Sequence, residues 1–303
     1  MRILLPLLFL FPVALEAQSP PFIVVLGIAQ DAGYPQVGCE KDCCMPAWRG
    51  ERDPERVTCL GLVDPATMQS WMFEATPDFP WQFQQLKQES GVSMPSGIFL
   101  THAHIGHYTG LMHLGREAYG ASQVPVYAMP KMREFLSTNG PWEQLVTLEN
   151  IKLAQLEDGV PVELAEGIRV TPFLVPHRDE YSETVGYRIE GPNRSVLFIP
   201  DINKWELWEK DLIEELAKVD VALLDATFAT ANELPGRDMA EIPHPFVEET
   251  MELLKDLPLE EKKKVTFIHF NHTNPLLDLG GRESLDVRWE GFEVAWTGLR
   301  IKL

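Results

Sequence analysis

Apolar and polar residues alternate in blocks along the chain, and these blocks predict a mixed α/β protein. Short apolar runs bounded by Gly, Pro, Asp or Asn are typical of buried strands, whereas apolar residues three or four apart are typical of helices. The first pattern occupies residues 22–28, 58–63, 71–74, 98–100, 124–129, 151–156, 160–164, 168–172, 184–189, 195–199, 219–224, 265–268 and 292–303. The second predicts helices at residues 79–91, 108–119, 131–139, 206–218 and 245–256.

One predicted strand stops abruptly at three histidines. The apolar run 98–100 is followed by Thr101, and then by His102, His104 and His107. On an extended chain His102 and His104 project to the same side and can hold one cation, while His107 lies past the turn and faces a second position. Neutral imidazole is the commonest metal ligand in proteins. The pattern therefore predicts a metal site at the end of this strand.

Three other apolar runs also end at residues that can bind a metal. His177 follows the run 173–176, Asp201 follows the run 195–200, and His269 follows the run 265–268. A fixed metal cluster is better assembled from rigid strand ends than from one loop. We therefore expect these side chains to converge on a catalytic metal centre. His113 has no partner at a matching spacing and is interpreted as a packing or surface histidine.

The length of the chain and its first residues predict a signal peptide followed by one domain. With 303 residues, no internal repeat and no Gly/Ser-rich linker, one domain over residues 18–303 is preferred to two. Residues 1–17 combine one early arginine, a short apolar segment and a small-residue ending at Ala17, which is typical of a secretory signal peptide. We expect export to the periplasm or beyond, and a mature form without a membrane span. The sequence does not indicate an oligomeric state.

The net charge bears on the class of substrate, and the cysteines bear on disulfide or zinc binding. The net charge of −19 argues against nucleic acid, because an acidic surface repels phosphate backbones, and so it favours a small-molecule substrate. The four cysteines, Cys39, Cys43, Cys44 and Cys59, all lie near the mature N-terminus. They are compatible with one or two disulfides in an oxidising compartment, or with a thiolate zinc site at Cys39, Cys43 and Cys44. We expect disulfide pairing.

In their order, these residues resemble the metallo-β-lactamase superfamily, whose pattern is His-x-His-x-Asp-His followed by a histidine, a bridging aspartate and a final histidine. The resemblance implies an αββα sandwich, in which two mixed β-sheets pack together with helices on the outer faces. It also implies a first metal held by His102, His104 and His177, a second held by His107 and His269, and Asp201 between them. One or two zinc ions suit the histidines, and the mixed N and O donors also suit manganese or iron.

Gly106 departs from the superfamily pattern, which has an aspartate at this position. The absence of this aspartate predicts a second metal site with fewer ligands. The substitution Gly106→Asp is expected to strengthen that site. His272 is an alternative donor, although we expect it rather to orient a ligand. Asp225 and Asp179 are weaker alternatives.

Two branches of the superfamily share further features with this chain. His244, between the aspartate and the last histidine, resembles a histidine that assists catalysis in phosphodiesterases such as the tRNA-end-trimming endonucleases. It precedes the predicted helix 245–256, where the helix dipole favours a neutral imidazole. The cysteine segment and residues 268–275 resemble the pyrroloquinoline quinone biosynthesis protein B family.

These features predict a metal-dependent hydrolase. The metal would lower the pKa of its bound water toward ~7, so that hydroxide attacks an ester or phosphodiester-type bond. Asp201 would position the hydroxide, and His244 would act as the general acid. One alternative is a pyrroloquinoline quinone biosynthesis protein B-like protein that binds or acts on a small quinone precursor. Another is a metal-binding protein without enzymatic activity.

Overall fold

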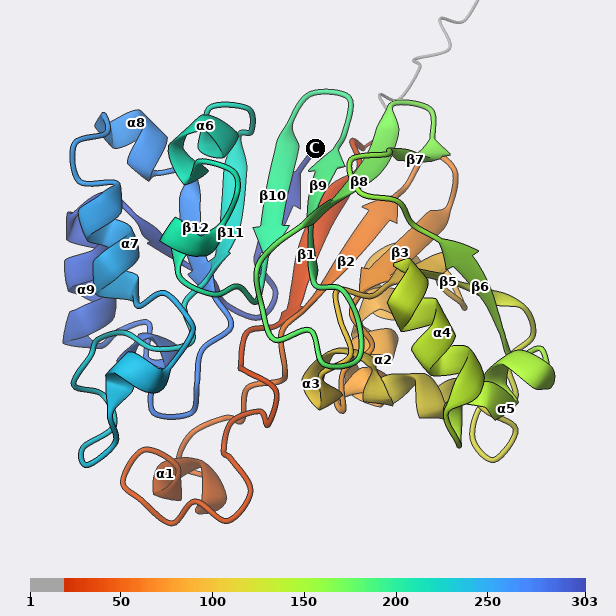
Figure 1. Ribbon diagram of the computed structural model, residues 1–303, viewed down its shortest axis with the longest axis horizontal. Coiled ribbons are helices and arrows are strands. Elements are labelled where there is room, and N and C mark those ends of the chain that lie inside the picture. Colours follow the sequence, from red (N-terminus) through yellow and green to blue (C-terminus); the bar gives the residue numbers. More distant parts are fainter. Residues whose placement is uncertain (1–18) are drawn as a thin grey trace, which may run out of the picture.

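The computed structural model describes residues 19–303, which form two seven-stranded β-sheets with helices on their outer faces (Figure 1). The predicted αββα sandwich is therefore confirmed. The predicted signal peptide lies outside the described residues. Within residues 19–303, the helices are all too short or too polar to cross a bilayer.

The first sheet has the strand order β14-β1-β2-β3-β4-β5-β6. Its strands are β1 (Phe22–Gly27), β2 (Cys59–Asp64), β3 (Gln69–Phe73), β4 (Gly97–Phe99), β5 (Val124–Ala128), β6 (Ile151–Gln155) and β14 (Arg300–Lys302). The second sheet has the order β13-β12-β11-β10-β9-β8-β7. Its strands are β7 (Val162–Ala165), β8 (Ile168–Leu174), β9 (Val185–Glu190), β10 (Ser195–Ile199), β11 (Val221–Asp225), β12 (Val265–Ile268) and β13 (Glu293–Val294).

Alternating side chains of the first sheet fill two separate cores. On β1, Ile23 and Val25 point into the core between the sheets, whereas Val24 and Leu26 point to the core beneath the helices. This follows from the two-residue period of a strand, which sends successive side chains to opposite faces. Aromatic rings join the sheets, since Phe73 of β3 packs edge-on against Tyr187 of β9 with ring centroids 5.5 Å apart. The near-continuous apolar strands are thus explained by burial on both faces.

Helices cover the outer face of each sheet (Figure 1). Beside the first sheet lie α2 (Phe79–Ser90), α3 (Ile105–Tyr108), η1 (Thr109–Leu114), α4 (Pro130–Thr138) and α5 (Trp142–Thr147). Beside the second lie α6 (Leu212–Leu216), α7 (Val247–Leu253), α8 (Leu259–Lys262) and α9 (Arg282–Trp289). The short helix α1 (Met45–Trp48) belongs to the cysteine segment, and the turns η2 (Trp205–Leu207), η3 (Met239–Glu241) and η4 (Pro275–Leu277) lie in connections.

Three predicted elements differ from the structure. The helix predicted at 108–119 is instead α3 followed by η1, because Gly110 packs tightly on Ala75 and donates its N–H to that carbonyl. The helix predicted at 206–218 begins only after Asp211, whose carboxylate caps α6. The closing strand predicted at 292–303 is two strands in different sheets. Gly298, with a φ of +98°, turns the chain and donates its N–H to Val25.

Candidate metal centre

Strand direction brings the candidate ligands to one place. In the first sheet β1, β3 and β4 run in the same direction, because β2 is antiparallel to β1 and β3, and β4 is parallel to β3. In the second sheet β8, β10, β11 and β12 share a direction. The loops after these strands carry the predicted ligands. The predicted convergence of strand ends is therefore what the topology produces.

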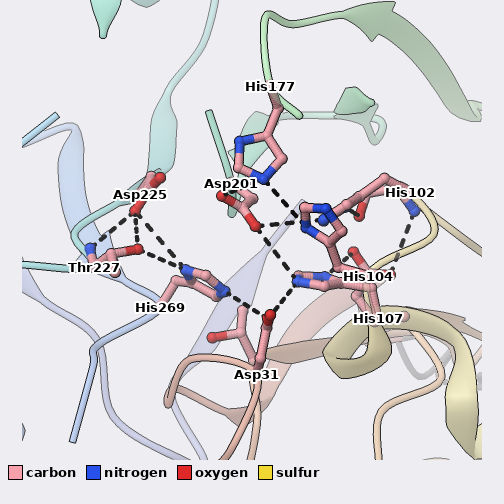
Figure 2. A network of polar contacts seen from close by, with 12 residues as sticks. Asp31, His102, His104, His107, His177, Asp201, Asp225, Thr227 and His269 are labelled. Carbon is pink, nitrogen blue, oxygen red and sulfur yellow. Dashed lines mark hydrogen bonds and ion pairs between the residues drawn. The ribbon is translucent and has the colours of Figure 1, made fainter. Parts of the chain in front are cut away.

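The first donor set consists of His102, His104, His177 and Asp201, whose ligand atoms lie within 4.8 Å of one another. Asp201 is central, with Oδ2 3.4 Å from His102 Nε2 and Oδ1 3.3 Å from His177 Nε2. The Nδ1 atom of His104 lies 3.3 Å from His177 Nε2. Figure 2 shows these four side chains facing one another. Three imidazoles and a carboxylate are an ordinary donor set for zinc.

The opposite ring nitrogens of this set contact neighbouring side chains. His102 Nδ1 lies 2.9 Å from Thr101 Oγ1, and His177 Nδ1 lies 3.2 Å from Asn203 Oδ1. Such outer contacts orient metal-ligating histidines. Burial lowers the pKa of both His102 and His177, which favours the neutral, ligating form. Within residues 19–303, His102 Nε2 is buried without a hydrogen-bond partner, as expected of an atom that serves a metal.

The second donor set contains His107, His269 and Asp201, together with Asp31. Asp31 Oδ1 lies 2.9 Å from His107 Nε2 and 3.7 Å from His269 Nε2, and Asp201 Oδ2 lies 3.7 Å from His107 Nε2. Figure 2 shows Asp31 between the two histidines. Where the departure at Gly106 predicts a missing carboxylate, the structure places Asp31, from the loop after β1.

The ring orientations of His107 and His269 are fixed by contacts with buried carboxylates and a hydroxyl group. Glu74, at the end of β3, places Oε1 3.2 Å from His107 Nδ1, and Thr227 Oγ1 lies 3.0 Å from His269 Nδ1. Both histidines are fully buried, which alone would lower the pKa of each. The carboxylates overcome this effect: Glu74 and Asp31 raise the pKa of His107 well above its ordinary value, and Asp225 and Asp31 raise that of His269 to about 9.

His244 lies beside both donor sets. Its Nδ1 atom is 2.9 Å from Asp225 Oδ2 and 3.2 Å from Asp201 Oδ1. Burial would lower the pKa of His244, but the charges of Asp225 and Asp201 raise it above the ordinary value. The structure therefore does not favour the expected neutral form, because the charges of these two carboxylates outweigh the effect of burial. A protonated imidazole next to the shared aspartate is the geometry a proton donor needs.

The cysteines form a separate cluster and not a disulfide. The Sγ atoms of Cys39 and Cys43 are 3.7 Å apart, whereas a disulfide requires about 2.05 Å. All four thiols are free, so the preference for disulfide pairing is wrong. Cys39, Cys43 and Cys44 gather with His272 within 4.8 Å, which is the donor set of a structural zinc site. His272 thus belongs to this cluster rather than to the histidine centre.

The remaining candidates take minor positions. Cys59 is fully buried in β2, and Asp179 is an exposed residue 3.9 Å from the Lys131 ammonium group. His113 stacks on Phe79, as the packing interpretation expected. Sequence reasoning missed Asp31, although it follows an apolar strand just as the recognised ligands do. That shared position was the available signal.

Comparison with known proteins agrees with this architecture. A family model described as "Beta-lactamase superfamily domain" matches residues 62–270. Coenzyme PQQ synthesis protein B of Nitrosococcus oceani is 28% identical, over 93% of this chain and 99% of that protein. The same protein of Methylorubrum extorquens strain PA1 is 27% identical, over 93% and 99%.

Solved structures share the fold. Zn²⁺-bound PqqB from Methylobacterium extorquens has a TM-score of 0.78 at 24% identity, covering 93% of this chain and 100% of that one. A diphosphatase from the PhnP family has a TM-score of 0.64 at 21% identity, covering 95% and 98%. The short form of human tRNase Z has a TM-score of 0.57 at 14% identity, covering 93% and 98%.

Proposed function

We propose that this chain, which belongs to the beta-lactamase superfamily, is a metal-dependent hydrolase of a small molecule. Its likeness to PqqB places the proposal in the PqqB-like branch of that superfamily. The bond cleaved is of the ester or phosphodiester type. The observation that carries the proposal is the pair of donor sets that share Asp201, each built from buried imidazoles with oriented outer contacts.

Zinc is the metal that the histidine-rich set favours, and PqqB of Methylobacterium extorquens was solved with Zn²⁺. When bound, it supplies a Lewis acid and lowers the pKa of water toward ~7. The chain contributes the geometry. His102, His104 and His177 would hold one ion, and Asp201, reaching both sets with its two oxygens, would fix the position of the attacking water.

His244 is placed to give a proton to the leaving group. The contact of Nδ1 with Asp225 keeps a proton on that atom, so the second proton of the imidazolium resides on Nε2. The nearby carboxylates raise the pKa of His244, which favours the doubly protonated imidazolium. A general acid of this kind is most useful when the leaving group is a poor one.

A cavity of about 450 Å³ beside His177 suits a small-molecule substrate. Lys131 and Lys210 line it together with Asp179 and Glu183, so it offers charges of both signs. The net charge of the whole chain is −19, which disfavours polyanionic nucleic acid. The cavity therefore favours a compact substrate over a polymer.

The test is turnover by the full chain loaded with zinc on bis(p-nitrophenyl) phosphate, p-nitrophenyl acetate and a lactone. Asp201→Asn is the matched control, since it preserves shape and removes the charge that both donor sets share. We expect at least one substrate to be hydrolysed at a rate that the variant lowers by about 10²-fold or more, comparable to the loss of a major electrostatic group. Equal rates for the parent and the variant on all three substrates would contradict the proposal.

A second candidate function has support from the comparisons. The curated relatives at 28% and 27% identity are coenzyme PQQ synthesis proteins that match over almost their whole length. A protein of this kind would bind or act on a small quinone precursor and hydrolyse generic esters weakly. Saturable binding of an ortho-quinone amino acid, together with no ester turnover above the Asp201→Asn control, would favour this alternative.

A further inference from the structure

The backbone at Gly106 leaves no room for a side chain, because Asp31 already lies there. A Cβ atom on Gly106 would be 2.5 Å from both the Cα and the Oδ1 atom of Asp31, and 2.7 Å from its Cγ atom. Non-bonded carbon atoms normally pack at about 3.5–4.0 Å. The aspartate of the superfamily pattern and the Asp31 loop are therefore mutually exclusive in this arrangement.

The Asp31 loop is fixed to the segment that delivers His269. Gln30 donates its N–H to the Phe270 carbonyl at 2.8 Å, and Phe270 donates its N–H to Ile28 at 2.8 Å. His269 itself has a φ of +70°, a conformation that residues other than glycine rarely adopt. Strained backbone of this kind clusters at ligand-binding sites. The backbone, not a freely moving side chain, thus sets Asp31 beside His269.

Two histidine rings present a nitrogen to the Asp31 carboxylate. Its Oδ1 atom faces His107 Nε2 at 2.9 Å and His269 Nε2 at 3.7 Å. His269 Nε2 is fully buried and has no hydrogen-bond partner within residues 19–303. The other nitrogen of each ring faces a different side chain: His107 Nδ1 lies 3.2 Å from Glu74 Oε1, and His269 Nδ1 lies 3.0 Å from Thr227 Oγ1. Both Nε2 atoms and the Asp31 oxygen therefore converge on one point.

We propose that Asp31 is the carboxylate ligand of the second metal, supplied from the loop after β1 in place of the aspartate that Gly106 replaces. The proposal rests on the proposed metal centre and deepens it, since it makes the centre a two-metal one. The second site then has two imidazoles and two carboxylates, and the first has three imidazoles and one carboxylate. The larger share of oxygen donors suits manganese and iron as well as zinc.

The experiment counts metal ions in the full chain, the Asp31→Asn variant and the Asp179→Asn control. An asparagine in place of Asp31 keeps the size of the side chain and removes its charge, while Asp179 is an exposed acid that belongs to neither donor set. Each protein is equilibrated with zinc, freed of excess ion and measured by elemental analysis, and its folding is checked by circular dichroism. We expect Asp31→Asn to hold one zinc ion fewer than both other proteins.

A second measurement excludes the cysteine cluster, because thiolates are poor ligands for manganese. Each protein is loaded with Mn²⁺ and studied by electron paramagnetic resonance. Two ions that share Asp201 give an exchange-coupled spectrum in the parent and the control, and Asp31→Asn should show the six-line signal of a single ion. Equal zinc counts together with a coupled spectrum in Asp31→Asn would overturn the Asp31 proposal alone. A parent protein that binds neither metal at the histidines would overturn the proposed metal centre with it.

Discussion

At the scale of single residues, Gly106 shows how a departure from a motif is absorbed elsewhere in the chain. The motif alone predicts a lost ligand, yet a carboxylate distant in sequence stands at the same point. Sequence spacing predicted His102, His104 and His107, because their relation is local. The contact between Asp31 and His107 joins residues 76 positions apart, so no local pattern contains it.

The first prediction concerns the space at Gly106. Gly106→Ala should destabilise the protein by about 1–3 kcal/mol, the usual result of inserting a methyl group into a packed site. The new Cβ would overlap Asp31, including its backbone. Urea unfolding measures the change, and Gly280→Ala is the control, since its nearest neighbour would be 3.6 Å away. A variant as stable as the parent would contradict the prediction and show that the Asp31 loop moves aside at little cost in free energy. For the same reason, Gly106→Asp should not increase the number of bound metal ions.

The second prediction concerns His244. His244→Ala should lower kcat by ~10²–10⁴-fold on a substrate with a poor leaving group, the usual contribution of a general acid. The loss should be much smaller with nitrophenolate, which departs without a proton. The metal content of the two donor sets should not change, because His244 belongs to neither of them and contacts Asp225 and Asp201 in a separate group. Equal losses on both substrates, or loss of metal, would exclude the acid role.

At the scale of elements, the strand ends are the predictable part of the site. Each apolar run that stops at a histidine or aspartate is a strand whose ligand lies at the shared edge, as predicted for His177, Asp201 and His269. Helix boundaries were less predictable, because tertiary contacts decide them: Gly110 packing on Ala75 shortens one helix. The split of the closing strand into β13 and β14 depends on which sheet edge is free, which local sequence does not encode.

The third prediction concerns the cysteine segment. If Cys39, Cys43, Cys44 and His272 hold zinc, the three thiols should react slowly with a thiol reagent in the zinc-loaded protein and rapidly after a chelator is added. Cys59 is an internal control, because its complete burial raises its pKa well above the ordinary value and blocks access. Peptide mapping of the labelled cysteines distinguishes them. Identical labelling with and without zinc would contradict a metal at this cluster.

At the scale of the whole molecule, the two sheets meet at the metal centre, since the first sheet provides Asp31, His102 and His107 and the second provides His177 and Asp201. Ions bound between them stabilise the folded state by mass action. As the fourth prediction, we expect a chelator to lower the free energy of unfolding by about 2.7 kcal/mol for each site at which the free metal concentration had been a hundred times the Kd. An unchanged unfolding temperature after complete metal removal would contradict this.

The fifth prediction is that metal binding releases protons. The pKa of His269 in the metal-free chain is about 9, so this ring is protonated at pH 7 and must lose its proton to bind a metal. Its folded pKa lies above the ordinary 6.5, so its stabilisation of the metal-free protein is complete below pH 6.5 and is lost as pH rises through 9. Metal affinity should therefore rise over this range. Calorimetry in buffers of different ionisation enthalpy measures the released protons, and a binding enthalpy independent of the buffer would contradict the prediction.

A crystal structure of the zinc-loaded protein with anomalous scattering data would locate the ions of the proposed two-metal centre around Asp201. At the histidines we predict two anomalous peaks about 3.5–4 Å apart, the usual separation in two-metal sites, besides any peak at the cysteine cluster. One should lie among His102, His104 and His177, and the other among His107, His269 and Asp31. A single peak at the histidines, or two peaks there of which neither contacts Asp201, would contradict the two-metal centre.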